Sequence, residues 1–341
     1  MKTVSIKKIS TTTIVSIAVS IAIAGSLAGL SACSSEAASP KALTLVAYDS
    51  FTPPEGAFDA FTADTGITVD IALSGDTGEM VAKAALTSGN PEGDVMWGVD
   101  NTLISRANES DVFDGTPVEV DFGDVCVNYD IAALEQLGLD APVSLEDLAS
   151  PDYRSLLVVE NASTSSPGLA FLLATVAAFD EGWPDYWQRL VDNDVLVVDS
   201  WDDAYYTAFT RYGGDRPLVV SYSTSPPAEV IFADPPLPTG APAPTGVAVE
   251  TCFRQTEYAG VLRGTKYPSQ ARQLVEYLAG PEFQKILPES LFVYPANRTV
   301  ALPDSFVQFA PTIDNSWTIS PEDIAANRQA WTEKWMSIVL S

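Results

Sequence analysis

The chain has 341 residues, a formal net charge of −27 and no histidine. Its length is enough for two domains with cores of their own. A chain this acidic repels nucleic acid and anionic membrane surfaces, so neither is an expected partner. The lack of histidine excludes the usual Ser–His nucleophile pairs and most zinc sites. Among the 45 acidic residues no spacing singles out a glycoside-hydrolysing pair. We therefore predict no enzymatic activity, no metal site and no cofactor.

The N-terminus has the pattern of a secretory signal peptide. Three lysines precede an apolar run over residues 13–30, and small residues end that run. A single-pass membrane anchor is the rival interpretation, but small polar residues interrupt the run and no basic stop-transfer cluster follows it. We therefore predict a signal peptide over residues 1–32 and export across the cytoplasmic membrane.

The predicted signal peptide ends in Leu30-Ser31-Ala32-Cys33, which resembles a bacterial lipobox. Cleavage before the cysteine would make Cys33 the first residue of the mature chain. In such proteins this cysteine carries lipid, which would anchor the chain on the outer face of the membrane. Residues 33–41 are then predicted to be a flexible tether between membrane and fold.

Between residues 42 and 100 the chain alternates between strand and helix patterns. Apolar runs at 42–47, 69–73 and 94–99 predict three strands, and helical spacing is present at 53–65 and 79–87. Such repeats are typical of a parallel sheet with crossover helices.

The alternation returns in the second part of the chain. Ser165-Ser166-Pro167 is a helix-start signal, because serine caps free amides and proline is tolerated in the first turn. Residues 233–246 are rich in proline and glycine and are predicted to be an exposed loop. After a helix start at 320–323, Trp331 and Trp335 are spaced to pack on one face of a helix. The predicted strands are 156–159, 195–198 and 218–221, and the predicted helices are 129–139, 169–179, 202–212 and 268–279.

Two long extended segments, 118–129 and 247–262, are predicted to link two α/β lobes as a double crossover. Lobe 1 is predicted to contain residues 42–122 and 255–341, and lobe 2 residues 123–254. Each segment contains one of the two remaining cysteines, Cys126 and Cys252. In an extracytoplasmic protein such a pair favours a disulfide, with two separate buried thiols as the alternative.

Aromatic residues follow two of the predicted strands. Trp201 comes after the strand at 195–198, and Tyr222 comes after the strand at 218–221. Ligands of open α/β sheets bind beyond the carboxyl ends of the strands. Both side chains are therefore candidates for a binding cleft, with packing at the edge of a core as the alternative.

Several short segments, spread over nearly all of the mature chain, match the motifs of a known family in the same order and at similar spacing. They are Tyr48-Asp49-Ser50-Phe51, Gly98-Val99-Asp100-Asn101, residues 164–169, Trp201 with Ala204-Tyr205, residues 221–226, and Val293-Tyr294-Pro295. Together they resemble the thiamine-binding proteins of ABC importers. The resemblance implies an α/β fold of the two-lobed, type II periplasmic-binding-protein kind, which closes on its ligand through two hinge crossovers.

The same resemblance implies a ligand site between the lobes. Lobe 1 would contribute Asp76 and Thr77, while Tyr48, Asp100 and Tyr294 are second-tier candidates. Lobe 2 would contribute helix-start serines and the residues at two strand ends. These are Ser165, Ser166, Trp201, Tyr222, Ser223, Thr224 and Ser225.

Thiamine joins a flat aminopyrimidine to a cationic thiazolium, and cationic rings bind well to Trp and Tyr faces. A carboxylate such as Asp76 can accept charge-assisted hydrogen bonds from the amino group. Ser165 and Ser166, at a helix start, would hold the hydroxyethyl tail or its phosphate. This sequence departs from familiar members in two places. The loop before Asp76 is one residue longer, and an aromatic is missing near Ala228.

The implied function is capture of thiamine, or a thiamine phosphate, by a monomeric lipoprotein that delivers it to a membrane permease. The nearest alternative is the same fold with a polyamine or ferric iron as ligand. Iron capture needs clustered tyrosines and an anion, and only Tyr222 stands at the expected place. A lipoprotein hydrolase and a structural surface lipoprotein are the remaining alternatives.

Overall fold

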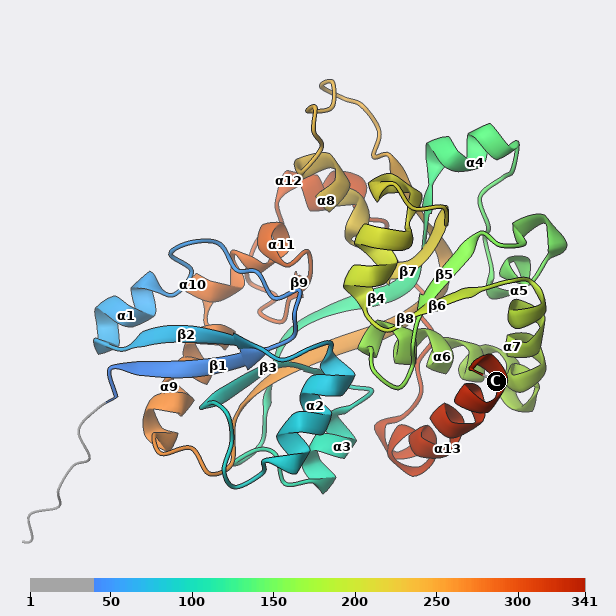
Figure 1. Ribbon diagram of the computed structural model, residues 1–341. Helices are drawn as coiled ribbons and strands as arrows, with labels where there is room; N and C mark the ends of the chain where they lie inside the picture. Colours follow the sequence, from blue (N-terminus) through green and yellow to red (C-terminus); the bar gives the residue numbers. More distant parts are fainter. Residues whose placement is uncertain (1–39, 341) are drawn as a thin grey trace, which may run out of the picture. The chain divides into compact units, whose positions relative to one another are not determined.

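One mixed β-sheet runs through residues 40–340, which are the residues that the computed structural model describes (Figure 1). Eight strands follow the order β2-β1-β3-β8-β4-β7-β5-β6, and the short β9 pairs with β4. These residues form one compact unit. The predicted signal peptide, Cys33 and most of the tether lie outside the described residues. The strands are β1 (Ala42–Ala47), β2 (Thr68–Leu73), β3 (Val95–Asp100), β4 (Val118–Asp130), β5 (Leu157–Glu160), β6 (Leu196–Val198), β7 (Leu218–Tyr222), β8 (Thr245–Val261) and β9 (Tyr294–Pro295).

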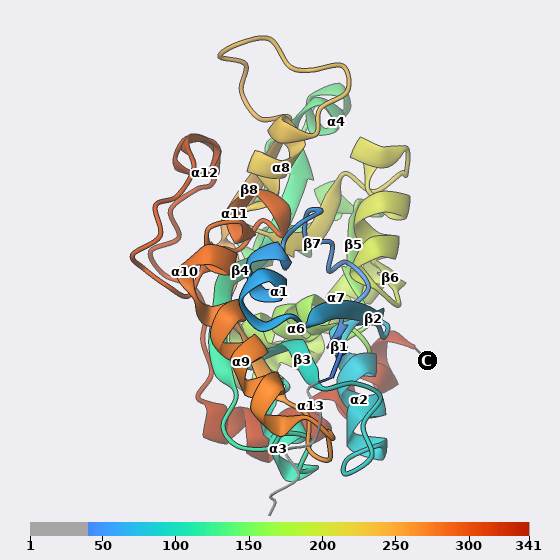
Figure 2. The same cartoon turned by 90° about the vertical axis from the view of Figure 1, so that its left-hand side faces the viewer.

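Two groups of parallel strands flank a central antiparallel pair. β1 pairs in parallel with β2 and β3, and β5 pairs in parallel with β6 and β7. The two longest strands, β4 and β8, pair with each other from Val118–Ala259 to Asp130–Thr245 and join the two groups. Figures 1 and 2 show both strands passing from one group to the other. The extended segments predicted at 118–129 and 247–262 are these two strands, and the predicted α/β fold class is confirmed.

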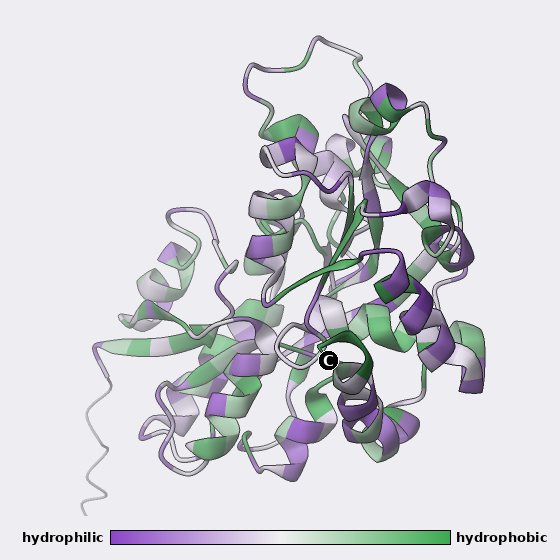
Figure 3. Ribbon diagram, turned by 45° about the vertical axis from the view of Figure 1, so that its right-hand side comes forward, coloured by the Kyte–Doolittle hydropathy of each residue, from purple (hydrophilic) through white to green (hydrophobic). Residues whose placement is uncertain are grey.

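The helices pack against this sheet, and the strands at its centre are largely hydrophobic while outer helix turns are polar (Figure 3). Every predicted strand agrees with an observed one to within two residues at each end. Within residues 40–340 no helix has the length and apolar character needed to cross a membrane. The helices are α1 (Asp59–Thr65), α2 (Thr77–Leu86), α3 (Ile104–Glu109), α4 (Ile131–Leu137), α5 (Leu145–Leu148), α6 (Ser166–Phe179), α7 (Trp183–Asp192), α8 (Ser225–Ile231), α9 (Pro268–Ala279), α10 (Pro281–Gln284), α11 (Leu287–Ser290), α12 (Asp304–Phe309) and α13 (Pro321–Val339).

Two of the predicted helices are wrong in part. The helix predicted at 53–65 begins only at Asp59, because Gly56 has a φ of 79° and turns the chain before it. The helix predicted at 202–212 is a π-helical turn (Asp203–Ala208) and a 3-10 turn (Thr210–Tyr212). Between these turns Phe209 leaves the helical conformation and forms a bridge with Arg216. The sequence patterns also gave no sign of α3, α5, α7 or α8.

The C-terminal helix α13 is held by its tryptophans. Ser320 caps it by accepting a 3.1 Å hydrogen bond from the amide of Asp323, as the helix-start signal predicts. Trp335 is fully buried, and its ring meets that of Trp187 in α7 edge-on at 5.5 Å. Trp331 packs, half-buried, against the same core cluster. Both tryptophans therefore serve packing, and α13 lies against α7.

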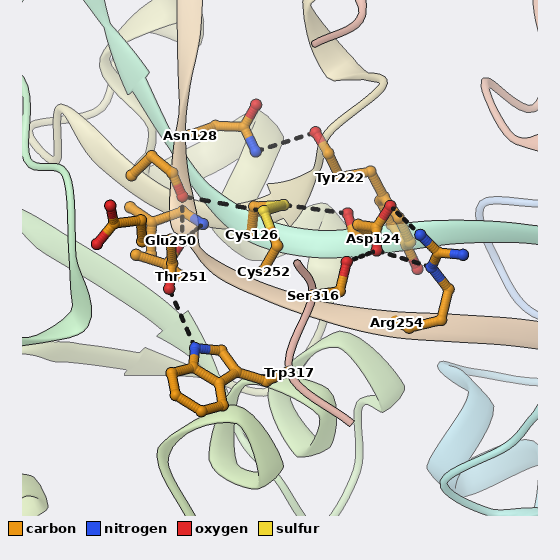
Figure 4. The surroundings of a disulfide bond; sticks show 12 residues. Asp124, Cys126, Asn128, Tyr222, Glu250, Thr251, Cys252, Arg254, Ser316 and Trp317 are labelled. Carbon is orange, nitrogen blue, oxygen red and sulfur yellow. Dashed lines mark hydrogen bonds and ion pairs between the residues drawn. A yellow bond between two sulfur atoms is a disulfide. The ribbon is translucent and has the colours of Figure 1, made fainter. Parts of the chain in front are cut away.

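A disulfide joins Cys126 of β4 to Cys252 of β8 at the centre of the antiparallel pair (Figure 4). Beside it, Arg254 makes a bidentate ion pair with Asp124, with N···O distances of 2.8 and 3.2 Å. A third segment lies along this pair, because the amide of Trp317 donates to the carbonyl of Cys252 at 2.8 Å. The register of β4 against β8 is thus fixed by covalent, ionic and backbone contacts.

Replacing Cys126 and Cys252 by alanine should lower the free energy of unfolding by about 2–5 kcal/mol, because the bridge restricts a long loop in the unfolded chain. Urea unfolding of the wild type and of the double variant measures the difference. Intact mass before and after reduction checks that the bond is present. Two alkylatable thiols in the unreduced protein would contradict the prediction.

Candidate functional site

A cavity of about 530 Å³ lies beyond the carboxyl ends of the parallel strands. Both strand groups contribute to its wall. Segments after β1 and β2 line one side, and segments after β5, β6 and β7 line the other. The chain around Phe292, between α11 and β9, adds a third part of the wall. The cavity is therefore enclosed by segments that are far apart in the sequence.

The two strand-end aromatics face this cavity. Trp201 follows β6, and its indole Nε1 donates a 3.0 Å hydrogen bond to Ser221 Oγ in β7. Tyr222 is the last residue of β7, where its carbonyl accepts a bond from Asn128 of β4 at 3.1 Å. Both side chains line the cavity, and both also pack, half-buried, against the edge of a core cluster, so the two interpretations describe different faces of the same side chains.

An aromatic wall extends from Trp201. The ring of Tyr205 stacks on Trp201 at a centroid distance of 4.9 Å and an interplanar angle of 17°. Tyr206 meets Trp201 edge-on at 5.4 Å, and Tyr206 also contacts Tyr212. All four side chains line the cavity. This stack offers flat faces to a flat ligand.

Glu229 of α8 holds this aromatic wall from behind. Its Oε1 accepts hydrogen bonds from the hydroxyls of Tyr205 (2.7 Å) and Tyr212 (3.1 Å). Its Oε2 accepts from Arg211 at 3.2 Å. Burial, together with the nearby Glu229 charge, raises the pKa of Tyr205 well above its usual range. The hydroxyls of Tyr205 and Tyr212 are therefore neutral and serve as hydrogen-bond donors to Glu229.

Asp76 connects the two strand groups. It caps α2, where its Oδ1 accepts a 2.6 Å hydrogen bond from the amide of Thr77. Its Oδ2 accepts a 3.1 Å bond from the amide of Trp201, which follows β6 in the other group. Burial raises the pKa of Asp76 to about 6, although the two amide bonds act in the opposite direction. The carboxylate of Asp76 thus links the part of the cavity wall after β2 to the part after β6.

The predicted hydroxyl residues lie around two helix starts. Ser166 begins α6, lines the cavity and accepts a 3.1 Å bond from Gln255. Ser165 is the N-cap residue of α6, but its side chain makes no capping bond. Ser225 begins α8 and shares a 2.9 Å hydrogen bond with Ser221. Thr224 lines the cavity and donates to the carbonyl of Phe292.

The cavity brings together most of the predicted ligand-binding residues. Ser165, Ser223, Asp100 and Tyr294 do not line it. Asp100 is fully buried and bonded to Thr102 and Gln255, and the ring of Tyr294 stacks on Phe122 at 5.1 Å. The predicted residues in the lining are Tyr48, Asp76, Thr77, Ser166, Trp201, Tyr222, Thr224 and Ser225.

Several lining residues are absent from the prediction. The position of Ala228 faces the cavity without an aromatic ring, but Phe232 stands one helical turn later. Its ring meets that of Phe292 at 5.4 Å, and both line the cavity. The four-residue spacing from Ala228 to Phe232 is a signal that could have indicated this substitute. Glu257, in the middle of β8, carries no such signal.

The lining is acidic as well as aromatic. Among the described residues, those that line the cavity include no lysine or arginine. Burial, with the neighbouring charge of Asp49, raises the pKa of Asp202. Within residues 40–340 no group of three His, Cys, Asp or Glu side chains is arranged to hold a metal ion. The acidic residues in the lining are Asp49, Asp76, Asp202, Glu257 and Glu289. The arrangement therefore suits an organic cation with flat rings.

Known proteins resemble this chain in fold and, at 26–28% identity, in sequence. The chain is 28% identical over 328 residues to the thiamine-binding periplasmic protein of Salmonella typhimurium. This alignment covers 90% of this chain and 96% of that protein. The protein of the same name from Escherichia coli is 27% identical over 331 residues, with the same coverage. A solved structure described as a periplasmic thiamin binding protein matches with a TM-score of 0.78 and 26% identity, over 87% of this chain and 96% of that one.

The fold and the inter-group cavity define the class of periplasmic binding proteins, of the type II kind predicted from the sequence. The family model described as bacterial extracellular solute-binding protein matches residues 68–311. The chain belongs to this family.

The raised pKa of Asp76 predicts a pH effect on stability. The folded state binds more protons than the unfolded state between pH 3.8 and about 6, so the contribution of Asp76 to stability falls as pH rises through that window. Relative to Asp76→Asn, the wild type should lose stability over this range. Urea unfolding at several pH values measures this difference. Asp70→Asn, an exposed position on β2, is the control and should show no such trend; an equal trend would contradict the assignment.

Proposed function

We propose that this protein is the extracytoplasmic receptor of an ABC importer and that it captures thiamine for delivery to a membrane permease. The observation that carries the proposal is the acidic, aromatic cavity between the two strand groups, which no lysine or arginine lines among the described residues. Relatives that carry the name thiamine-binding periplasmic protein span nearly the whole chain and support the same ligand.

The aromatic wall fits the flat rings of thiamine. A cationic thiazolium over the face of Trp201 or a neighbouring tyrosine gains roughly 0.5–2 kcal/mol. The stack of Trp201 on Tyr205 keeps these faces aligned before the ligand arrives, so less side-chain entropy is lost on binding. Phe232 and Phe292 supply the apolar surface that the missing aromatic at Ala228 would otherwise provide.

The carboxylate of Asp76 can still accept a hydrogen bond from the amino group of the aminopyrimidine. Each oxygen already accepts one backbone amide, but an ionised carboxylate has about four lone-pair sites. A further bond from the amino group would therefore be added without breaking the contact with Trp201. Because the described residues that line the cavity include no lysine or arginine, the cavity favours thiamine over its more negative diphosphate ester.

The central strands β4 and β8 are the hinge in this proposal. Residues 42–122 and 255–341 make up lobe 1, and residues 123–254 make up lobe 2, with α13 at the end of lobe 1 packing against α7 of lobe 2. Closure brings Asp76 of lobe 1 against the amide of Trp201 in lobe 2. Since this contact and the cavity wall share Trp201, a ligand that stacks there stabilises the closed form.

The membrane anchor completes the proposed function. A signal peptide over residues 1–32 directs export, and the lipid on Cys33 holds the receptor at the outer face of the cytoplasmic membrane. Residues 33–41 let the receptor reach its permease. A tethered receptor stays at a high effective concentration near that partner.

A polyamine is the second candidate ligand, because five carboxylates line the cavity. Polyamines lack the flat rings that would use the aromatic wall. Titration calorimetry with thiamine and with spermidine therefore separates the two. We expect thiamine to bind and spermidine not to displace it; spermidine binding without thiamine binding would overturn the proposal.

Trp201→Ala should weaken thiamine binding by about 10- to 100-fold, because it removes the stacking face at the centre of the wall. Trp201→Phe keeps a flat aromatic face, so it should weaken thiamine binding less than Trp201→Ala does. Trp317→Ala, which removes a tryptophan beside the disulfide and outside the cavity lining, is the matched control. Equal affinities of Trp201→Ala and wild type would count against the proposed site.

Cys33→Ala should release the protein from the membrane. Without the cysteine no lipid is attached, and the chain partitions into the soluble extracytoplasmic fraction. Fractionation of cells that express the wild type or the variant measures this, with the lipid detected by mass spectrometry of the N-terminal peptide. A variant that stays in the membrane fraction would point to an uncleaved apolar segment instead.

A further inference from the structure

Three carboxyl side chains form a row across the centre of the sheet. Glu257 of β8 pairs with Asp100 of β3 on one side and with Asp121 of β4 on the other. Directly paired residues point to the same face of a sheet, where like charges destabilise. The exposed fractions are 0% for Asp100, 1% for Asp121 and 3% for Glu257. A row of three buried acids is costly unless something offsets their charge.

The three acids differ in their partners. Asp100 accepts bonds from the hydroxyl of Thr102 at 2.7 Å and from Gln255 at 2.6 Å, so both of its oxygens are satisfied. Within the described residues, both oxygens of Asp121 and Oε2 of Glu257 have no hydrogen-bond partner. Tyr48 donates a hydrogen bond to Glu257, so the unsatisfied charge of the row is concentrated on Asp121 and on Oε2 of Glu257.

Only Glu257 among the three lines the cavity. Beside it, Gly98, with a φ of 94°, leaves room for the ring of Tyr48, because a Cβ there would lie 2.3 Å from that ring. Burial, and then the charges of Asp121 and Asp100, raises the pKa of Glu257 well above its usual range. Burial does the same for Asp121. The titratable groups that face Glu257 are Asp121 of β4, Asp100 of β3, Tyr48 after β1, Asp76 at the start of α2 and Tyr222 of β7.

None of these facing groups is cationic, so the positive charge that the row lacks has to come from a proton or from a ligand. With the proposed function as its basis, we propose that Glu257 is the charge partner of the cationic thiazolium and that the bound cation replaces a proton held by Glu257 and Asp121 in the empty cavity. The proton leaves to the solvent as the thiazolium enters, so the net charge of the cavity region is the same before and after binding. The aromatic wall favours ligands with flat rings, whereas Glu257 favours ligands with a positive charge.

This assignment predicts two measurable effects. Thiamine binding should release up to one proton at neutral pH, because the cation and the proton compete for one carboxylate. The protein should also prefer thiamine to thiothiamine, a neutral analogue in which the C–H between the ring sulfur and nitrogen is replaced by C=S, so that the ring is no longer a cation. Glu257→Gln keeps the shape of the side chain and removes its charge. It should abolish proton release and reduce the preference for thiamine by at least tenfold.

Titration calorimetry in buffers of different ionisation enthalpy counts the protons released by wild type, Glu257→Gln and the control Glu250→Gln, whose side chain is exposed on the same strand. Glu250→Gln should match the wild type. Asp121→Asn should keep the preference for thiamine and release fewer protons, because Glu257 is then more readily ionised in the empty protein. Far-ultraviolet circular dichroism and urea unfolding check that each variant is folded.

The outcomes separate this inference from the proposed function. If the wild type binds thiamine but Glu257→Gln keeps both the proton release and the preference over thiothiamine, the role of Glu257 is overturned and the receptor function stands. Equal binding of thiamine and thiothiamine by the wild type would likewise overturn it. If the wild type binds no thiamine, both the function and the inference fail.

Discussion

The antiparallel pairing of β4 with β8 is the constraint on which the rest of this structure depends. It joins two groups of parallel strands into one sheet, so the ends of both groups meet at a single cavity. It also sets Glu257 opposite Asp121. A slip of one residue would turn every side chain of one strand to the other face, and the carboxylate would leave the cavity. The Cys126–Cys252 disulfide and the bidentate Arg254–Asp124 pair therefore fix the chemistry of the site as well as the fold.

The cavity breaks the rules that the surrounding core obeys. Elsewhere most buried side chains are aliphatic or aromatic, although some buried polar groups such as Glu160 also lack a partner among the described residues. At the centre of the sheet, buried carboxyl groups stand opposite one another and lack partners. Natural sequences violate local consistency chiefly where function demands it, and perturbed titratable groups concentrate at such places. Asp121 and Glu257 fit this pattern because the cost of their burial falls when a cation arrives. Stability is therefore lowered in the empty protein in a way that favours binding.

The sequence predicts this fold well because the apolar runs are almost sufficient by themselves to locate the strands. Each strand pattern agrees with the structure, and so does the position of Trp201 and Tyr222 at strand ends. What the patterns miss depends on tertiary contacts. The aromatic wall at 203–212 is an irregular turn that the Phe209–Arg216 bridge imposes, and no local periodicity encodes that bridge. Phe292 reaches the cavity from the C-terminal part of the chain. Glu257 looks like an ordinary strand residue until the register of three strands is known.

The contact between Asp76 and Trp201 explains why a flat cation suits this cavity better than a flexible one. The amide of Trp201 is bonded to Asp76 across the two strand groups, while its indole is bonded to Ser221 and stacked on Tyr205. Closing the cavity therefore brings Asp76 of one strand group against an aromatic wall that is already assembled within the other group. A ligand shifts such an equilibrium only as far as its affinity differs between the open and closed forms. A flexible polycation would pair with the acidic residues of either group in both forms. In the proposed function, a planar cation that stacks on the wall of one strand group and pairs with Glu257 of the other would bind the closed form better than the open form, and so would drive closure.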